Sequence, residues 1–232
     1  DRLRAAPLEP AALRGHVRAA PDGRTTQADQ AVSTAHASAQ PASMHERILD
    51  AADRLFYAHG IQSIGVDAVV LEAGISKRTL YKHFGSREQL IAAYLERRGA
   101  RRPELPKPGD ELHEILGVFR RFERWFASET FRGCPFSNAI AELGGDAAHP
   151  ALAVARDIKA RNSAWFEVRL RALGVAQTAA LATQLSILVE GAVTLAVQRH
   201  ADGGAPQVAR AAGAAARALL AHAGVVLDDG AT

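Results

Sequence analysis

Apolar side chains recur at three- and four-residue steps from residue 44 to residue 223 of this 232-residue chain. Because this spacing follows the period of an α-helix, it gathers the apolar side chains of each segment on one face. The sequence contains no apolar-polar alternation of useful length, which is the pattern of a half-buried β-strand, and no repeat typical of solenoid proteins. The pattern therefore predicts an all-α protein.

Serine and glycine residues mark the ends of the first predicted helices. Ser43 and Glu46 have the spacing of a capping box, which begins a helix. Gly74 ends a second, short helix, since a residue without a Cβ readily adopts the left-handed conformation of a tight turn. Ser76 and Ser86 are expected to cap the third and fourth helices. The first three helices are predicted over residues 44–59, 66–73 and 76–84.

A proline-rich segment with Pro103, Pro106 and Pro108 interrupts this pattern and marks a boundary between two helical domains. We expect an N-terminal domain with a connecting helix in residues 43–102 and a second domain in residues 103–232. The helices of the second domain are predicted over residues 109–128, 136–144, 150–173, 177–200 and 204–223.

Residues 1–42 differ in composition from the rest of the chain. They lack Phe, Trp, Tyr and Ile, so they cannot bury enough apolar surface to offset the entropy lost on ordering. We expect a disordered N-terminal extension. The single methionine, Met44, immediately precedes the first periodic segment, which suggests the hypothesis that natural translation starts there.

The charge of the chain is unevenly distributed. The net charge is +3, yet Lys77, Arg78, Lys82 and Arg87 place four positive charges within twelve residues that contain no acid.

No membrane span and no secretory signal is visible, and a single cysteine, Cys134, forms no disulfide within the chain. We therefore expect a cytoplasmic protein.

The basic segment coincides with two short helices joined by a glycine turn. This is the arrangement of a helix-turn-helix motif, in which the first helix supports the second and the second reads DNA. Ile75, Leu80 and Phe84 fall on the apolar side of the second helix. The basic side chains fall on or near its exposed side, so the sequence predicts a surface that binds double-stranded DNA.

The segment RILDAADRLFYAHG, followed by VDAVVLEAGISKRTLYKHFGSREQLIAAYL, resembles the DNA-binding domain of the TetR family of bacterial transcriptional regulators over residues 47–95. The resemblance implies that Tyr81, His83 and Arg87 contact phosphates. It also implies that base edges are contacted by Ser76, Lys77, Arg78, Thr79 and Lys82.

Two departures from the family pattern affect the second helix. Ile64 and Gly65 stand where a Ser or Thr is common, so this helix lacks a hydroxyl cap unless Ser63 supplies it. Val70 stands where alanine is frequent, so packing against the recognition helix is expected to be tighter or shifted.

For the second domain, the resemblance implies an effector-binding and dimerisation domain whose ligand weakens DNA binding. Small residues in 177–200 and 204–223 allow close approach of helices, so these segments are expected to form a homodimer interface, with internal core as the alternative.

Cys134 is either a sensor thiol or a buried, inert residue, and we favour the second. An effector pocket is expected among aromatic and polar residues, although any of these can instead be core. The pocket candidates are Phe119, Phe122, Trp125, Phe126, Phe136, Asn138, Glu142, Trp165, Phe166, Gln184 and Glu190.

Two other classes of function compete with a regulator. A helical small-molecule-binding enzyme is disfavoured because the sequence contains no phosphate-binding glycine loop, no nucleophile elbow and no metal-ligand spacing of its histidines. An architectural DNA-binding protein without an effector has little use for a large second domain rich in aromatic residues. The sequence predicts a DNA-binding repressor released by a small molecule, without cofactor, metal or membrane partner.

Overall fold

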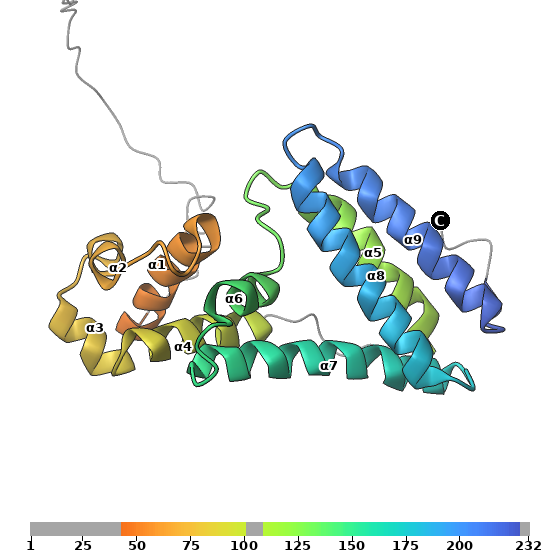
Figure 1. The fold of residues 1–232 in the computed structure, drawn as a ribbon, viewed down its shortest axis with the longest axis horizontal. Coiled ribbons are helices and arrows are strands. Elements are labelled where there is room, and N and C mark those ends of the chain that lie inside the picture. Colours follow the sequence, from red (N-terminus) through yellow and green to blue (C-terminus); the bar gives the residue numbers. More distant parts are fainter. Residues whose placement is uncertain (1–42, 101–108, 228–232) are drawn as a thin grey trace, which may run out of the picture. The chain divides into compact units, whose positions relative to one another are not determined.

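The computed structural model of the protein describes residues 43–100 and 109–227, and within these ranges the chain forms nine α-helices and no strand (Figure 1). The predicted extension of residues 1–42 and the prolines before residue 109 lie outside the described residues. The helices are α1 (Met44–His59), α2 (Val66–Ala73), α3 (Lys77–Phe84), α4 (Arg87–Ala100), α5 (Glu111–Phe126), α6 (Pro135–Leu143), α7 (Pro150–Ala172), α8 (Thr178–Arg199) and α9 (Ala205–His222).

The predicted all-α class is confirmed, and the helix ends agree with the predictions to within a few residues. The Ser43 hydroxyl accepts a hydrogen bond from the Glu46 N–H at 3.2 Å, as the capping spacing predicts. Helix α2 begins after Gly65 without a side-chain cap, so Ser63 does not supply the missing hydroxyl.

One hydrophobic core lies among α1, α2, α3 and α4 and extends into α6 and the first turns of α7. Ile48 and Leu90 are fully buried in it, and Phe56 packs edge-on against Tyr94 with ring centroids 5.5 Å apart. Leu152 and Ala155 of α7 belong to the same core. Residues from both sides of the proline segment therefore stabilise the N-terminal helices.

A second core lies among α5, α8, α9 and the last turns of α7 (Figure 1). Small side chains such as Ala196, Ala209 and Ala216 are buried where these helices meet, which allows their backbones to approach closely. A Cβ at Gly213 of α9 would lie 3.4 Å from the Cβ of Phe119 in α5. The C-terminal helices are therefore packed through small residues.

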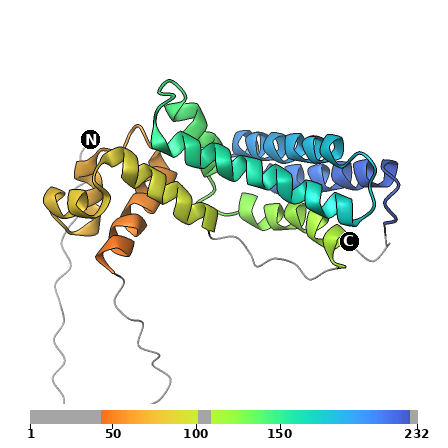
Figure 2. The ribbon, with the colours of Figure 1, turned by 90° about the horizontal axis from the view of Figure 1, so that it is seen from below.

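Helix α7 connects the two cores, since its first turns contact α4 and α6 and its last turns contact α8 (Figure 2). Gly99 permits the contact with α4: a Cβ at this position would lie 2.6 Å from Cδ1 of Ile158. A side chain larger than hydrogen at residue 99 would require the side chain of Ile158 to shift.

Helix α8 is the one described helix that is long and apolar enough, by length and composition, to cross a membrane. Its most apolar window has a mean hydropathy of 1.7, yet only 33% of that window is buried in the monomer. One such helix is weak support for a membrane span, because helices in the cores of soluble proteins can have the same length and composition.

Candidate nucleic-acid interface

Helices α2 and α3 are joined by a tight turn centred on Gly74. Gly74 has φ 63° and ψ 45°, the left-handed conformation; its N–H donates to the Leu71 carbonyl, and the N–H of Ile75 donates to the Val70 carbonyl. Ser76 then begins α3, accepting a hydrogen bond from the Thr79 N–H at 3.1 Å. The local sequence thus produces a helix-turn-helix.

The inner side of α3 is anchored in the first core. Leu80 is fully buried and Phe84 nearly so, while Arg47 of α1 donates from Nη2 to the Ala73 carbonyl at the end of α2. That hydrogen bond, 2.8 Å long, satisfies a carbonyl that the helix itself leaves unpaired. The turn between α2 and α3 is therefore held by α1.

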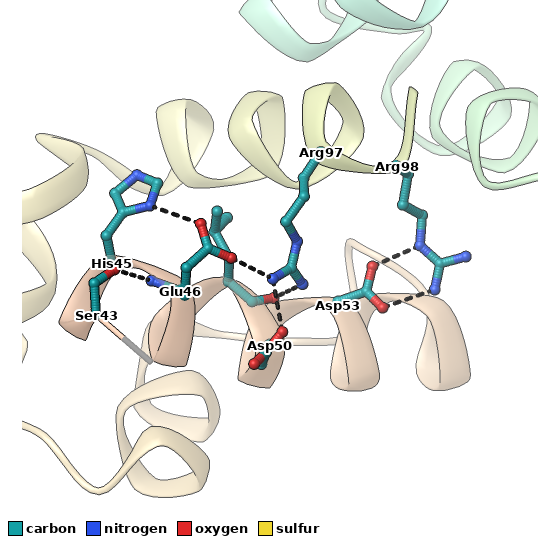
Figure 3. A network of polar contacts seen from close by, with 8 residues as sticks. Ser43, His45, Glu46, Asp50, Asp53, Arg97 and Arg98 are labelled. Atoms are coloured by element: carbon teal, nitrogen blue, oxygen red, sulfur yellow. Dashed lines mark hydrogen bonds and ion pairs between the residues drawn. The ribbon is translucent and has the colours of Figure 1, made fainter. Parts of the chain in front are cut away.

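Two arginines of α4 fix its position along α1 (Figure 3). Arg97 donates to Asp50 at 2.7 Å and to the Leu49 carbonyl at 2.7 Å. Arg98 forms a bidentate ion pair with Asp53, in which Nε and Nη2 donate to the two carboxylate oxygens at 2.6 and 3.0 Å. Both guanidinium groups are largely shielded from water, so these ion pairs orient α4 better than exposed pairs would.

The outer side of α3 exposes most of the residues predicted to contact DNA. Arg78, Lys82 and His83 are exposed, and Tyr81 retains 43% of its accessible surface. Among the described residues, no carboxylate lies within ion-pair distance of Arg78 or Lys82. Both charges are therefore available to an external anion.

Lys77, the first residue of α3, has an acidic partner that the sequence analysis missed. Its Nζ lies 2.7 Å from Oδ1 of Asp67 in α2, and both side chains are mostly exposed. The hydrogen bond to Asp67 and the charge of its carboxylate raise the pKa of Lys77. The spacing of residues 67 and 77 alone does not reveal this contact, because it depends on the angle between the two helices.

Arg87 is placed differently from the other candidate residues. Its Nη2 donates to the carbonyls of Ile61 at 2.5 Å and Ile64 at 3.0 Å, in the loop between α1 and α2. The guanidinium group therefore supports the loop before α2. Any contact of Arg87 with a phosphate therefore has to use those N–H groups of the guanidinium that do not already donate to these carbonyls.

His45 at the start of α1 is a further exposed residue beside the predicted surface. Its ring stacks on Phe84 with centroids 4.6 Å apart and lies 6.4 Å from the ring of His83. The sequence analysis did not select His45, because it is separated from the basic segment by more than thirty residues.

The second domain contains a cavity of about 540 Å³ among α5, α6, α7 and α8. This volume is in the range of small-molecule sites. Of the predicted pocket residues, Phe122, Trp125, Phe136 and Glu190 line the cavity. Residues that the prediction missed also line it, namely Arg98, Arg121, Cys134, Pro135, Lys159, Asn162, Val189 and Val193.

The remaining pocket candidates lie elsewhere. Phe119 and Phe126 are buried in the second core, and Trp165 stacks under the guanidinium of Arg169 at 3.7 Å. Phe166 lines a smaller, neighbouring cavity. Outside the cavity lie Asn138, which donates to the Arg132 carbonyl, Glu142, which accepts from the Gln62 N–H, and Gln184, which is exposed.

Cys134 is half-buried, precedes the first residue of α6 and lines the cavity. The fully buried position that we favoured from the sequence is thus not observed, whereas the inertness of the thiol stays a prediction.

Comparison with known proteins agrees with this geometry. Residues 48–94 match the family described as bacterial regulatory proteins, tetR family. Over 86 residues the chain is 48% identical to an uncharacterized HTH-type transcriptional regulator of Mycobacterium tuberculosis. That match covers 37% of this chain and spans only 40% of the length of the curated relative.

Two crystal structures are similar over most of the chain. A putative TetR transcriptional regulator of Streptomyces avermitilis is 33% identical with a TM-score of 0.69, covering 80% of this chain and 100% of that one. A TetR-family regulator of Streptomyces coelicolor is 28% identical with a TM-score of 0.68, covering 78% and 95% of the two chains. With a helix-turn-helix that matches the family and a relative covered along its whole length, this chain belongs to the TetR family of transcriptional regulators.

Proposed function

We propose that the protein is a homodimeric repressor that binds a double-stranded DNA operator in the bacterial cytoplasm and is released by a small molecule. The observation that carries the proposal is the outer side of α3, where Arg78, Tyr81 and Lys82 are exposed on a helix whose inner side is buried. A helix held in this way fits the major groove of DNA.

Two kinds of contact are assigned to this surface. Arg78 and Lys82 read base edges, since a bidentate contact to guanine distinguishes bases by about 1–3 kcal/mol. Tyr81 and His83 bind phosphates, which gives affinity without sequence preference. Arg87 contributes to the same kind of contact through its N–H groups that are not already hydrogen-bonded. Lys77 joins the first group only when it leaves Asp67.

The exposed apolar side of α8 supports the proposal of a homodimer formed through α8 and α9. Ile187 retains 66% and Leu195 45% of their accessible surface, although both are large apolar residues. A groove of about 650 Å³ lies between α8 and α9 and is lined by both residues together with Gly191 and Ala211. A second copy of the chain would bury this face, and a two-fold axis would present two α3 helices to successive major grooves.

Release by a ligand is proposed to pass through Tyr57 of α1. Its hydroxyl donates to the Gly133 carbonyl at 3.0 Å and accepts from the Arg132 N–H at 3.1 Å. Cys134, which follows Gly133 in the chain, lines the cavity. Arg98 also lines the cavity, and its guanidinium carbon lies 3.9 Å from the centre of the Tyr57 ring. A ligand that moves this loop or Arg98 would move α1 and, through α1, the turn before α3.

Selection of binding sites from a random DNA pool with the purified full-length chain tests the proposal. We expect a sequence with two inverted half-sites about one helical turn apart. The double variant Arg78→Ala/Lys82→Ala is the control and should enrich no such sequence. A wild-type protein that enriches none, while remaining folded by circular dichroism, would contradict the proposal.

A further inference from the structure

We propose that the cavity among α5, α6, α7 and α8 binds a hydrophobic organic anion, with the anionic group of the ligand on Arg121. The inference rests on the proposed function only in treating this ligand as the effector. It concerns which chemical class the cavity accepts, and it is tested without DNA.

The walls of the cavity favour a flat, apolar ligand body. Phe122 and Trp125 of α5, with ring centroids 5.7 Å apart, line it together with Phe136 of α6. Val189 and Val193 of α8 complete the apolar lining. Aromatic and aliphatic side chains of this kind bind fused or linked rings through apolar contact.

Two of the three basic residues in the lining are already neutralised. Arg98 is held by both oxygens of Asp53, at 2.6 and 3.0 Å. Lys159 forms a close ion pair with Glu190, whose other oxygen accepts a hydrogen bond from Ser137 at 2.9 Å. Glu190 is the one carboxylate in the lining, and its existing partners leave it little capacity to bind a cationic ligand.

Arg121 is the basic residue of the lining that remains. Among the described residues, it has no carboxylate within ion-pair distance, and it is both exposed and part of the lining, which places it at the mouth of the cavity. Gly117 makes room for it, because a Cβ there would lie 3.1 Å from Nη1 of Arg121. A larger residue at position 117 would displace the guanidinium group.

The surroundings of Arg121 disfavour an uncompensated positive charge. Desolvation lowers the pKa of Arg121, and the neighbouring charges of Arg120 and Arg124 lower it further, whereas Glu114 opposes them. An anion bound at this position would relieve that unfavourable environment. The guanidinium group also offers two parallel donors, which suit a carboxylate or sulfonate.

Asn162 supplies a second polar anchor. Its Oδ1 is buried without a hydrogen-bond partner among the described residues, and it lines both this cavity and the neighbouring one. A buried acceptor without a partner is unfavourable, so a ligand with an N–H or O–H group near this atom gains a hydrogen bond. The ligand class is therefore an aromatic or alicyclic acid that also carries a donor.

Two fluorescent probes separate charge from shape. We choose 8-anilinonaphthalene-1-sulfonate and N-phenyl-1-naphthylamine, which share the aromatic body and the N–H but differ in the sulfonate. The chain has two tryptophans, so Trp165→Phe leaves Trp125 of the cavity as the single reporter. Because helix α8 lines both this cavity and the groove between α8 and α9, the Arg121→Gln variant below identifies which part of the Trp125 quenching comes from probe bound in the cavity.

We expect the sulfonate probe to bind the full-length Trp165→Phe protein about tenfold or more tighter than the neutral probe. Adding Arg121→Gln should remove that difference by weakening the sulfonate probe alone. Adding Arg156→Gln, at an exposed arginine of α7 outside the lining, should leave it unchanged. Circular dichroism of each variant confirms that the helices are intact.

Equal affinity for the two probes, or an unchanged sulfonate affinity in the Arg121→Gln protein, would overturn the assignment. Either result would leave the proposed DNA binding untouched, because site selection needs no ligand. Conversely, failure to select an operator would not alter the difference between the probes.

Discussion

Nζ of Lys77 lies 2.7 Å from Oδ1 of Asp67, so the first residue of the proposed recognition helix is joined to the helix before it. A contact between Lys77 and DNA has to replace this ion pair. Because both side chains are mostly exposed, the pair is weak, and the exchange requires little free energy. If the protein binds DNA as proposed, we expect Asp67 to limit nonspecific binding by Lys77 without preventing a specific contact.

Replacing Asp67 with asparagine should strengthen binding to DNA of unrelated sequence. Loss of the pair frees Lys77 for one more phosphate, so the affinity should rise by up to about fivefold. The slope of log affinity against log salt concentration should become more negative by about 0.9. Fluorescence anisotropy titrations of a random duplex over a series of salt concentrations measure both quantities.

The matched control for this prediction is Glu72→Gln. Glu72 is also on α2 and pairs with Arg54 of α1 at 2.8 Å, so the variant changes the net charge equally without freeing a residue of α3. A salt slope that changes equally in both variants would show that overall charge, and not Lys77, is responsible.

Arg78→Ala should relax sequence preference at particular base pairs of the selected operator. Arg78 is exposed on α3, and among the described residues it has no ion-pair partner, so its guanidinium group is available to a guanine edge. We expect a loss of about 1–3 kcal/mol of discrimination at the contacted pair. Binding measurements against a series of single-base operator variants give this value, and an equal loss of affinity for every sequence would contradict the assigned role.

Arg87→Ala should reduce both stability and DNA affinity. The variant loses the hydrogen bonds from Nη2 to the carbonyls of Ile61 and Ile64, which precede α2. Charge-assisted hydrogen bonds of this kind contribute about 1–3 kcal/mol to the free energy of unfolding. Urea denaturation measures the loss of stability, and DNA affinity should fall alike for operator and unrelated DNA.

Arg78→Ala serves as the stability control for Arg87→Ala, since a substitution of an exposed side chain without partners changes the unfolding free energy by less than about 0.5 kcal/mol. An unchanged urea midpoint in the Arg87→Ala protein would show that the loop before α2 does not depend on this arginine.

Local signals explain why the helix-turn-helix was predictable and the cavity was less so. Gly74 and the caps at Ser43 and Ser76 act within a few residues of sequence, and all three are observed as predicted. Whether an aromatic residue lies in a core or a cavity depends on which helices meet. Periodicity therefore could not separate Phe126, which is fully buried, from Phe122, which lines the cavity.

The basic residues of the cavity were missed for a related reason. Arg121 lies in a run of basic residues on α5, a pattern that usually indicates a solvated helix face. Its position in the lining results from the packing of α5 beside α8, and no feature of the neighbouring sequence indicates it.

Leu195→Glu should convert the proposed dimer into a monomer. Leu195 is 45% exposed and lines the groove between α8 and α9, so a carboxylate there would be buried without a partner when two copies associate. Sedimentation velocity at several protein concentrations should show a single species of half the wild-type mass, and binding to a two-half-site operator should weaken. Val168→Glu, at an exposed apolar position of α7 outside that groove, should keep the mass of the wild-type protein. A Leu195→Glu protein that stays dimeric would exclude this face of α8 as the interface.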